Sequence, residues 1–573
     1  MFAFIFLSFL ALTITNLIWL QKTQSPKNDD EVVVDDEGFV QVKRLANVSL
    51  TPLQAVFLAV NFILFVVLVN YIVLNRLNLR YFSFVFVVIL IFAALLYLVR
   101  EGFKDRVKIA DSWFVILGFV GGVLALLYTV FGGRTYFHAE EYAALITPSS
   151  NTFSAEVDTI DANTLPVVDK AYGERLGVLK LGEFPGLGSE FQVGEYTDIK
   201  YQGEQYLVAP LEYRDIFKWL NNRDVGTAGY ILINKVTEET RLINLTAQNG
   251  TGLKYVETAY FSQDLLRHVY YNGTTKYERI AVHFEIDEAM NPYFVVQLGL
   301  PTIFVNGGRD VVAIALVDAI TGETTIHDVG EVPEFVDNVY DDALVLEQLN
   351  YYGTLRDGFL NSIFNQVGVL RPSPGRRTVI NSDELYHFTG MTSAGGDEST
   401  VGFAYVNMRT KQSTLYSFPG ATEIAAMNKT LTLIPQNNIS ASFPVPVSIA
   451  DEATYYILIK GQDGRIIRHV FMNVQDLQVS GIATSQSSAL NNYLLNLDAD
   501  SNQELSTDSG PILAIDSYVL EGNTVYLITL EDGSYTVNFS NVSSDIIRDI
   551  LALDVGETVT LGLVGNTIVS INP

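Results

Sequence analysis

The sequence predicts a membrane-anchored α+β protein. It would have about four transmembrane helices at its N-terminus, a large β-rich extracytoplasmic region, and a small OB-like barrel at its C-terminus. Three observations lead to this class. Long apolar stretches are confined to the first 134 residues, acidic residues gather after residue 134, and short strand-like runs joined by turn residues recur through the acidic part.

Four apolar stretches near the N-terminus are long enough to cross about 30 Å of hydrocarbon as helices. They are residues 2–20, 53–74, 82–99 and 113–131. One such stretch alone can be a buried core helix, but four in succession with almost no internal charge favour transmembrane spans. The first stretch lacks a basic n-region and a clear small-residue cleavage site, which favours a retained span over a cleaved signal peptide.

The loops between these stretches predict an orientation. Eight Lys and Arg residues fall on one side and three on the other, which places the first set in the cytoplasm and everything after residue 134 outside. Asn61, Asn70 and the GxxxG pair Gly118 and Gly122 lie within the stretches and indicate helix–helix packing. No ionisable side chain lies well inside a stretch, so an ion-coupled transport path is disfavoured.

Charge and cysteine content exclude several classes of function. The chain of 573 residues has 36 Lys+Arg and 64 Asp+Glu, of which residues 1–134 hold only 11 and 9. The rest is therefore strongly acidic and repels phosphate backbones, so no nucleic acid partner is expected. The chain has no cysteine, which excludes disulfides, thiolate nucleophiles and cysteine-based metal sites.

The acidic region repeats one local pattern, an apolar run, a turn and a second apolar run. The four copies are residues 230–243, 311–326, 402–418 and 455–471, and each predicts a β-hairpin. Their spacing of roughly 55–90 residues is too irregular for a solenoid or a propeller, so we expect them to form one or two antiparallel sheets. Helices are predicted at residues 212–222, 262–271, 333–352 and 359–366.

These patterns predict a domain order. An anchor at residues 1–134 is followed by a linker at 135–165. A β-rich region of two or more subdomains then occupies residues 166–480. An acidic linker at 481–511 leads to a small module at 512–573. The last 60 residues predict three strands, a helix at 544–553 and two more strands. This order matches an OB-like barrel, and without a basic face a docking role is favoured for it.

No motif of catalysis or cofactor binding was found, so the sequence predicts neither an enzyme nor a bound cofactor. His283 and Glu285 form an isolated HxE pair, which two residues on one strand face often do by chance. Asp498, Asp500 and Asn502 begin like a calcium loop, but Gln503 and Ser509 break the EF-hand pattern, so a solvated acidic linker is the favoured interpretation.

Glycoside hydrolysis needs two carboxylates at a set separation, which a sequence alone does not provide. Asp397 and Glu398, in the loop sequence AGGDES, are the pair that we would examine first. A tight surface turn is the simpler interpretation of that loop.

Several segments carry a resemblance to a known family. They are KWLNN at 218–222, YFSQDLLRH at 260–268, VPEFVDNVY at 332–340, YGTLRDGFLNSIF at 352–364, and the run at 386–422. In order and spacing they resemble large hypothetical membrane-anchored envelope proteins of Gram-positive bacteria. The strand–VNxxTxx–strand hairpins are similar to PepSY-type modules. The resemblance implies an envelope protein of bacterial or phage origin and supplies no activity.

The expected function is a structural or protein-interaction component of the cell envelope. Its partners would be membrane lipid, through the N-terminal helices, and a protein partner or a second copy of the chain. Two alternatives stay open, a carboxylate-dependent envelope hydrolase and a ligand-binding sensor that acts through a partner. The expected location is an integral membrane protein with its large C-terminal region outside the membrane.

Overall fold

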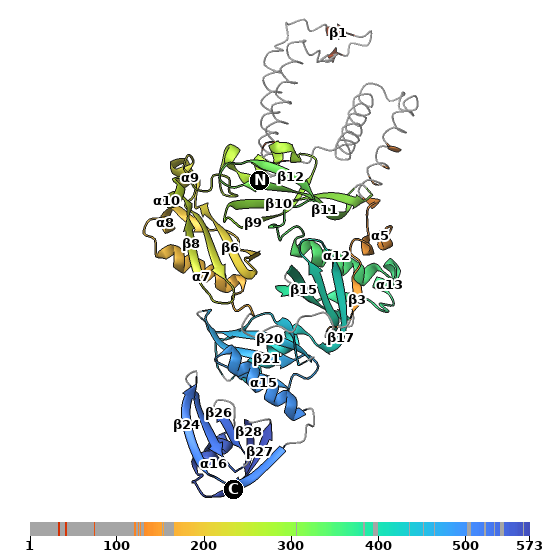
Figure 1. Ribbon diagram of the computed structural model, residues 1–573. Coiled ribbons are helices and arrows are strands. Elements are labelled where there is room, and N and C mark those ends of the chain that lie inside the picture. The colour runs from red at the N-terminus through yellow and green to blue at the C-terminus, as the bar shows by residue number, and fades with distance from the viewer. Residues whose placement is uncertain are drawn as a thin grey trace. The chain divides into compact units, whose positions relative to one another are not determined.

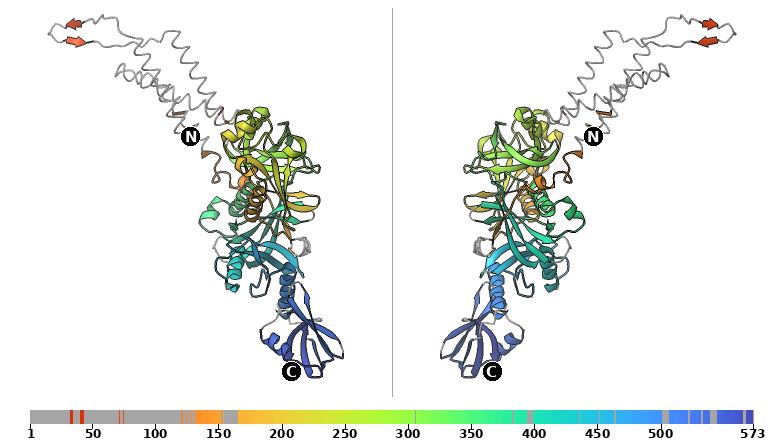
Figure 2. Two further views of the ribbon diagram at one scale, coloured as in Figure 1. Left: turned by 90° about the vertical axis from the view of Figure 1, so that its left-hand side faces the viewer. Right: turned by 90° about the vertical axis from the view of Figure 1, so that its right-hand side faces the viewer.

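The computed structural model describes most of the chain after residue 130 (Figures 1 and 2). The described residues are 32–34, 40–42, 71, 74, 120, 121, 124, 127, 131–151, 153, 165–304, 306–381, 384–393, 399–434, 436–450, 452–462, 464–500, 506–520, 523–531, 533–538, 544–564 and 567–572. The chain divides into two compact units, residues 1–81 with 270–276, and residues 82–269 with 277–573.

The described part of the first unit is small. Strands β1 (Val32–Val34) and β2 (Val40–Val42) pair antiparallel, and Tyr270–Thr274 form one turn of π-helix. The rings of Tyr71 and Tyr271 stack with their centroids 6.3 Å apart.

The structure corrects the predicted fold class. Strands predominate in the described residues, and none of the helices found there combines the length and the apolar character that a membrane crossing requires. The predicted spans 2–20, 53–74, 82–99 and 113–131 lie outside the described residues except at isolated positions, and Asn61, Asn70, Gly118 and Gly122 also lie outside them. The predicted class of a membrane-anchored α+β protein is therefore wrong, and a mostly β architecture replaces it.

The second unit contains four copies of one structural repeat. Each copy has a helix and then an antiparallel meander of four strands that follow one another in sequence. The meanders are β5-β6-β7-β8, β9-β10-β11-β12, β14-β15-β16-β17 and β19-β20-β21-β22. We call these copies the first to fourth repeats and assign them residues 165–244, 253–269 with 277–328, 338–421 and 422–483.

The first two repeats lie between residues 165 and 328. The first contains α7 (Lys170–Gly182), α8 (Leu187–Glu190), β4 (Phe191–Val193), β5 (Thr197–Tyr201), β6 (Glu204–Tyr213), α9 (Ile216–Asn222), β7 (Gly229–Asn234) and β8 (Thr240–Asn244). After α10 (Leu245–Asn249) and the short 3₁₀ turn Phe261–Gln263, the second contains α11 (Leu265–Val269), β9 (Glu278–Ile286), β10 (Pro292–Ile303), β11 (Gly307–Asp318) and β12 (Thr324–Asp328).

The third and fourth repeats follow directly. The third contains α12 (Asp342–Leu355), α13 (Phe359–Ile363), β13 (Leu370–Pro372), β14 (Arg377–Asn381), β15 (Glu384–Ser393), β16 (Ser399–Asn407) and β17 (Ser413–Ala421). The fourth contains α14 (Glu423–Leu433), β18 (Ser440–Ala441), β19 (Val445–Ile449), β20 (Glu452–Lys460), β21 (Ile466–Asn473) and β22 (Ser480–Ala483).

The hairpin turns show that the repeats are equivalent. Each third strand ends on Asn or Asp, and its side-chain oxygen accepts the backbone N–H groups of the residues two and three positions later. The four residues are Asn234, Asp318, Asn407 and Asn473. A side chain that holds its own turn in this way is a local signal. The four predicted hairpins are confirmed as β7–β8, β11–β12, β16–β17 and β20–β21. The first three have such a turn, whereas the turn held by Asn473 joins β21 to β22.

The prediction that the hairpins form one or two sheets is wrong, because each repeat forms its own sheet. In each repeat, the residue after the third strand bonds both to the second strand and to the segment before the helix. In the third repeat the N–H of Met408 donates to Leu385 at the start of β15, and the carbonyl of Met408 accepts from Val339 and Tyr340, just before α12. The same pattern recurs at Lys235, Ala319 and, with one acceptor bond, Val474. Four sheets result, each with its own helix.

The predicted helix at 333–352 starts later than expected. Asp341 caps α12 by accepting the N–H of Ala343, so the helix begins at Asp342. Residues 332–338 lie outside the helix and include a turn, in which the N–H of Val336 donates to the Pro333 carbonyl. Their backbone groups also bind to the side chains of Arg409 and Glu285. The other predicted helices are shorter in the structure, as α9, α11 and α13.

Sheets and helices share two large cores. The first includes Leu207, Ile231, Phe284, Phe403 and Tyr455, and the second lies beside α12 and includes Val295, Ile314 and Leu349. The stretch 481–511, predicted as an acidic linker, instead contains α15 (Gln486–Asp500) and β23 (Ser506–Pro511). Ala489 and Tyr493 of α15 are fully buried against the fourth repeat, and this burial stabilises the helix. Figure 1 shows α15 beside the sheet that contains β20 and β21.

The C-terminal module has its own core, which includes Ile528, Val537 and Leu561. Its remaining elements are β24 (Ala514–Leu520), β25 (Asn523–Thr529), β26 (Ser534–Asn538), α16 (Ser544–Leu551), β27 (Thr558–Val564) and β28 (Thr567–Asn572). The sheet order is β23-β27-β28-β26-β25-β24. β23 and β24 are consecutive in sequence, so residues 506–520 form both ends of the sheet, as the first strand of an OB barrel does. The module thus begins before residue 512.

A short strand far back in the chain completes the third repeat. β3 (Ser149–Asn151) pairs parallel with β17, through Thr414, Leu415 and Tyr416. Two residues later, the ring of Phe153 is 2% exposed and lies 5.5 Å from that of Phe403 and 5.8 Å from that of Tyr416, measured between centroids. Residues 135–165, predicted as a linker, therefore contribute a strand and a core side chain.

Candidate functional site

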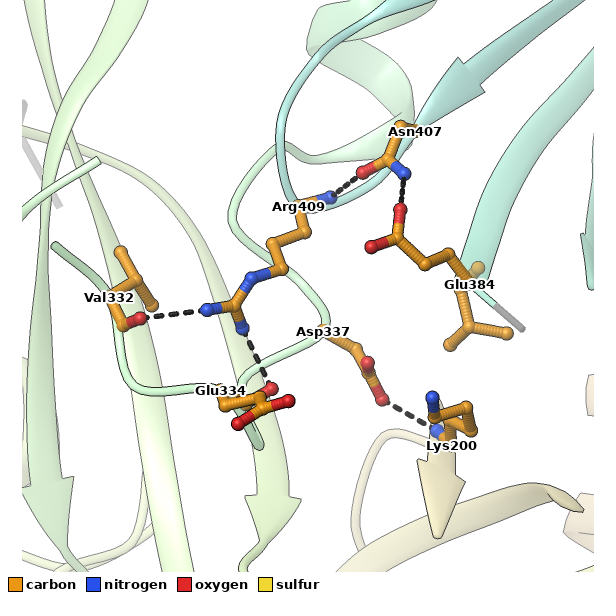
Figure 3. Close-up of a pocket in the computed structure, with 8 residues that line it drawn as sticks. Lys200, Val332, Glu334, Asp337, Glu384, Asn407 and Arg409 are labelled. Carbon is orange, nitrogen blue, oxygen red and sulfur yellow. Dashed lines mark hydrogen bonds between the residues drawn. The ribbon is translucent and has the colours of Figure 1, made fainter. Parts of the chain in front are cut away.

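A polar cavity of about 430 Å³ lies between the first and third repeats (Figure 3). Its lining residues come from β5, from the loop before α12, from the start of β15, and from the end of β16 and the turn after it. They are Lys200, Val332, Glu334, Asp337, Glu384, Leu385, Asn407 and Arg409. The cavity is therefore lined by charges of both signs.

The Arg409 guanidinium is bound to backbone carbonyls. One terminal nitrogen donates to the carbonyls of Pro333, Glu334 and Val336, each at 2.8 Å, and the other donates to Val332 at 2.8 Å. Figure 3 shows the side chain reaching from the β16–β17 turn toward this segment. Arg409 therefore holds residues 332–336 in a non-helical loop, and these carbonyls compete with a ligand for its donors.

Two carboxyl groups, those of Glu285 and Asp337, lie close to this segment. Glu285 on β9 is fully buried and accepts the backbone N–H groups of Asp337 at 2.8 Å and Asn338 at 2.9 Å, and also the Asn338 amide at 2.9 Å. Asp337 accepts the N–H of Lys200. Burial raises the pKa of Glu285. Burial and then repulsion from Glu285 raise the pKa of Asp337.

A buried ion pair lies on the other side of Asn338. Lys235 Nζ lies 2.5 Å from Asp198 Oδ1, and both side chains are almost fully buried. Burial alone raises the pKa of Asp198, but the nearby cations Lys235 and Lys170 more than offset it and lower the pKa. Burial lowers the pKa of Lys235, and its attraction to Asp198 does not reverse that shift because Arg377 and Lys170 repel it.

Two histidines lie near the start of α12. His387 Nε2 is 2.9 Å from the Tyr340 carbonyl, to which it donates. His283 Nε2 has no hydrogen-bond partner within the described part of the chain, and its nearest carboxylate oxygen, Asp341 Oδ1, is 3.6 Å away. Burial lowers the pKa of His283 to about 3, with repulsion from Lys170 as the next cause. His283 is therefore neutral over the ordinary pH range.

A second carboxyl cluster consists of Glu195 and Glu212 of the first repeat and Glu257 at the start of the second. Burial raises the pKa of Glu212, near the end of β6, to about 7, and repulsion from Glu257 adds to the shift. The pKa of Glu257 is also raised, by burial and then by Glu195. A carboxyl whose pKa is raised toward neutrality beside a second carboxyl is an arrangement that general acid catalysis uses.

The structure does not bring the predicted site residues together. His283 and Glu285 lie on one strand, but Glu285 binds backbone amides and His283 approaches Asp341. Asp397, Glu398 and Asn502 lie outside the described residues, and Asp498 and Asp500 are in the last turn of α15, where their side chains are not described. In the part of the chain that the structure describes, no three His, Asp or Glu side chains are grouped as a metal site.

Sequence reasoning missed Arg409, Asp337, Asn338 and the pair Asp198–Lys235. No local motif marks them, because their partners lie 37 to 140 positions away along the chain. The one local signal was the strand–VNxxTxx–strand pattern, since Asn407 and Arg409 belong to it.

Comparison with known proteins adds no assignment. No protein-family model matches the chain, and no curated protein matches it either.

Proposed function

We propose that this chain is a protein-interaction component, in which tandem small modules present binding surfaces to a protein partner or to a second copy. The observation that carries the proposal is the fourfold repetition of one helix-and-meander unit, followed by an OB-like module. Tandem modules of this kind multiply exposed surface and sheet edges, which proteins commonly use to bind other proteins.

The bonding of the charged groups supports this proposal. Arg409 donates hydrogen bonds to four backbone carbonyls, Glu285 accepts three N–H groups, and Asp198 forms an ion pair with Lys235. These contacts hold the repeats and the 332–338 segment in place. The strongly acidic composition after residue 134 favours a partner with a basic surface or a copy that pairs through uncharged residues.

The test is the particle mass of the full-length chain together with crosslinking in its source cells. A stable mass at a multiple of 63.5 kDa, or a specific crosslinked protein, is the expected result. A 63.5 kDa monomer that crosslinks to nothing, even at about 100 μM, would contradict the proposal. Location in a cell envelope and lipid contact by residues 1–134 stay predictions from the sequence.

A second candidate is a carboxylate-dependent hydrolase, favoured by the raised pKa of Glu212 beside Glu257. Hydrolysis of a glycan substrate by the full-length chain, lost in Glu212→Gln and kept in Glu140→Gln, would support it. Glu140 is an exposed carboxylate on α5 (Ala139–Ala143) and serves as the control. Equal activity in both variants would exclude it.

A further inference from the structure

The last strand of each repeat lies at the end of its sheet, and the chain treats these four edges differently. In the third repeat the edge strand β17 receives β3 as a parallel partner. In the fourth repeat, side chains of α15 cover β22, where Asn496 donates to the Ser480 carbonyl at 2.7 Å and Asn492 donates to the Ile482 carbonyl at 3.1 Å. Both edges thus have partners within the same chain.

The equivalent edge of the second repeat is open. β12 ends the sheet β12-β11-β10-β9, and among the described residues no strand pairs with its outer side. Thr325, Ile326 and Asp328 are exposed, and Ile326 keeps 42% of its surface accessible. An edge strand directs alternate N–H and C=O groups outward, where they can bond to another strand.

The sequence of β12 has few of the features that usually protect an edge. It is Thr-Thr-Ile-His-Asp, with three β-branched residues and no lysine, arginine or proline, and its one acidic residue, Asp328, is the last of the strand. The equivalent strand β8 contains Arg241 beside Glu239, and a charge of this kind discourages strand addition. The difference selects β12, rather than β8, as the binding edge.

We infer that β12 pairs antiparallel with β12 of a second copy, so that two four-stranded sheets join across a twofold axis. This inference rests on the proposed function and names its partner. With Ile326 on the axis, Ile326 faces its copy, Thr325 faces His327, and Thr324 faces Asp328. No like charges oppose one another, and Thr325 and His327, whose side chains already bond at 2.9 Å within one strand, can exchange partners across the axis.

The pairing joins five residues from each copy, so the contact is small. Interfaces below about 1,200 Å² are typically weak, and we expect dimers at tens of micromolar rather than nanomolar concentration. A weak contact of known register is best detected by covalent trapping. The absence of cysteine from the chain makes a single introduced thiol unambiguous.

The experiment compares Ile326→Cys with Val401→Cys in the full-length chain under a mild oxidant. Opposed residues on antiparallel strands have Cα atoms about 4.5–5.5 Å apart, within the range of a disulfide. Val401 is the matched control because it is 40% exposed but lies on β16, which has strands on both sides. We expect at least about tenfold more covalent dimer from Ile326→Cys. Equal yields, or no dimer, would overturn the inference.

A second variant tests the contact without covalent chemistry. Ile326→Lys places two ammonium groups opposite each other on the axis and should shift the dissociation constant at least about tenfold, with Val401→Lys unchanged. Thermal unfolding of each variant verifies folding. If wild-type chain does not dimerise but a different protein crosslinks to it, the proposed function survives and this inference fails. If nothing binds, both fail.

Discussion

The ion pair Asp198–Lys235 and the carboxyl pair Glu285–Asp337 are both bonded to Asn338, yet they tolerate burial in opposite ways. The Asn338 amide donates to the Asp198 carbonyl and to the Glu285 carboxylate, each at 2.9 Å. The first pair neutralises its charges in place. The second has charges of like sign, so it stays buried by retaining a proton, as the raised pKa of each carboxyl indicates.

The difference shows that a buried polar contact depends on its partners and on pH. In the ion pair each charge offsets the other, so neither side chain has to gain or lose a proton to stay buried. The stability that the carboxyl pair contributes should change with pH near neutrality. Each of the following predictions removes one part of this contrast, from the largest expected effect to the smallest.

Removing Lys235 should have the largest effect. Lys235→Met leaves Asp198 buried without its ion-pair partner, and breaking a buried pair in this way typically costs about 3–5 kcal/mol of unfolding free energy. Urea denaturation of the full-length chain measures the change. Lys180→Met is the control, since Lys180 pairs with Glu183 at 2.7 Å on the surface. A loss no larger than that of the control would show that Lys170 and Arg377 replace Lys235.

Removing the like charge should stabilise the protein at higher pH. Because both carboxyl pKa values are raised on folding, the pair favours the folded state below the ordinary carboxyl range, and this contribution is lost as pH rises through neutrality. Asp337→Asn can still accept the N–H of Lys200, and it should raise the unfolding free energy by about 1–2 kcal/mol at about pH 8.

Measuring this effect requires two pH values. At about pH 5 the wild type and Asp337→Asn should differ much less than at about pH 8. Asp357→Asn, at an exposed carboxylate paired with Arg356, should leave the pH profile unchanged. Parallel profiles for the wild type and Asp337→Asn would mean that Glu285 and Asp337 do not share a proton.

An exposed ion pair should contribute least. Arg309 contacts Glu278 at 3.3 Å and Glu347 at 3.1 Å, and all three side chains are at least a quarter exposed. Arg309→Gln should cost about 0–1 kcal/mol, and the cost should fall in about 1 M salt because water and ions screen such pairs. A cost that persists at high salt would mean that the arginine stem, rather than its charge, stabilises the contact.

The sequence predicted local features of this molecule well and distant ones poorly. Three of the four predicted hairpins are recognisable because the turn is held by its own Asn or Asp side chain, within three residues. The fourth, at 455–471, is recognisable from its Asp-Gly turn sequence. The apolar spacing of residues 333–338 allows a helix, so the sequence predicts one where the structure has a loop. Its conformation is decided by Arg409 and Glu285, which lie about 50 to 77 positions away along the chain.

The same distinction applies to the candidate site. Asp397, Glu398, Asp498, Asp500 and Asn502 were chosen because they lie close together in sequence. The carboxyls that are close in space, Glu285 and Asp337, are 52 positions apart. Glu285 lies on the second repeat, and Asp337 lies in the loop just before the third. Only the fold brings them together, so no spacing rule applied to the sequence alone would have selected them.

The pairing of β3 with β17 has a consequence for synthesis on the ribosome. Ser149 and Thr414, which face each other in this pairing, are 265 residues apart. At about 5–20 residues per second, β3 leaves the ribosome roughly 15–50 s before its partner strand exists. During that interval the first and second repeats can fold locally, whereas Phe153 has no core to enter. The segment that completes the third repeat therefore stays unpaired for the longest time. A chaperone that shields short exposed strands would bind most readily at residues 149–153 during that interval.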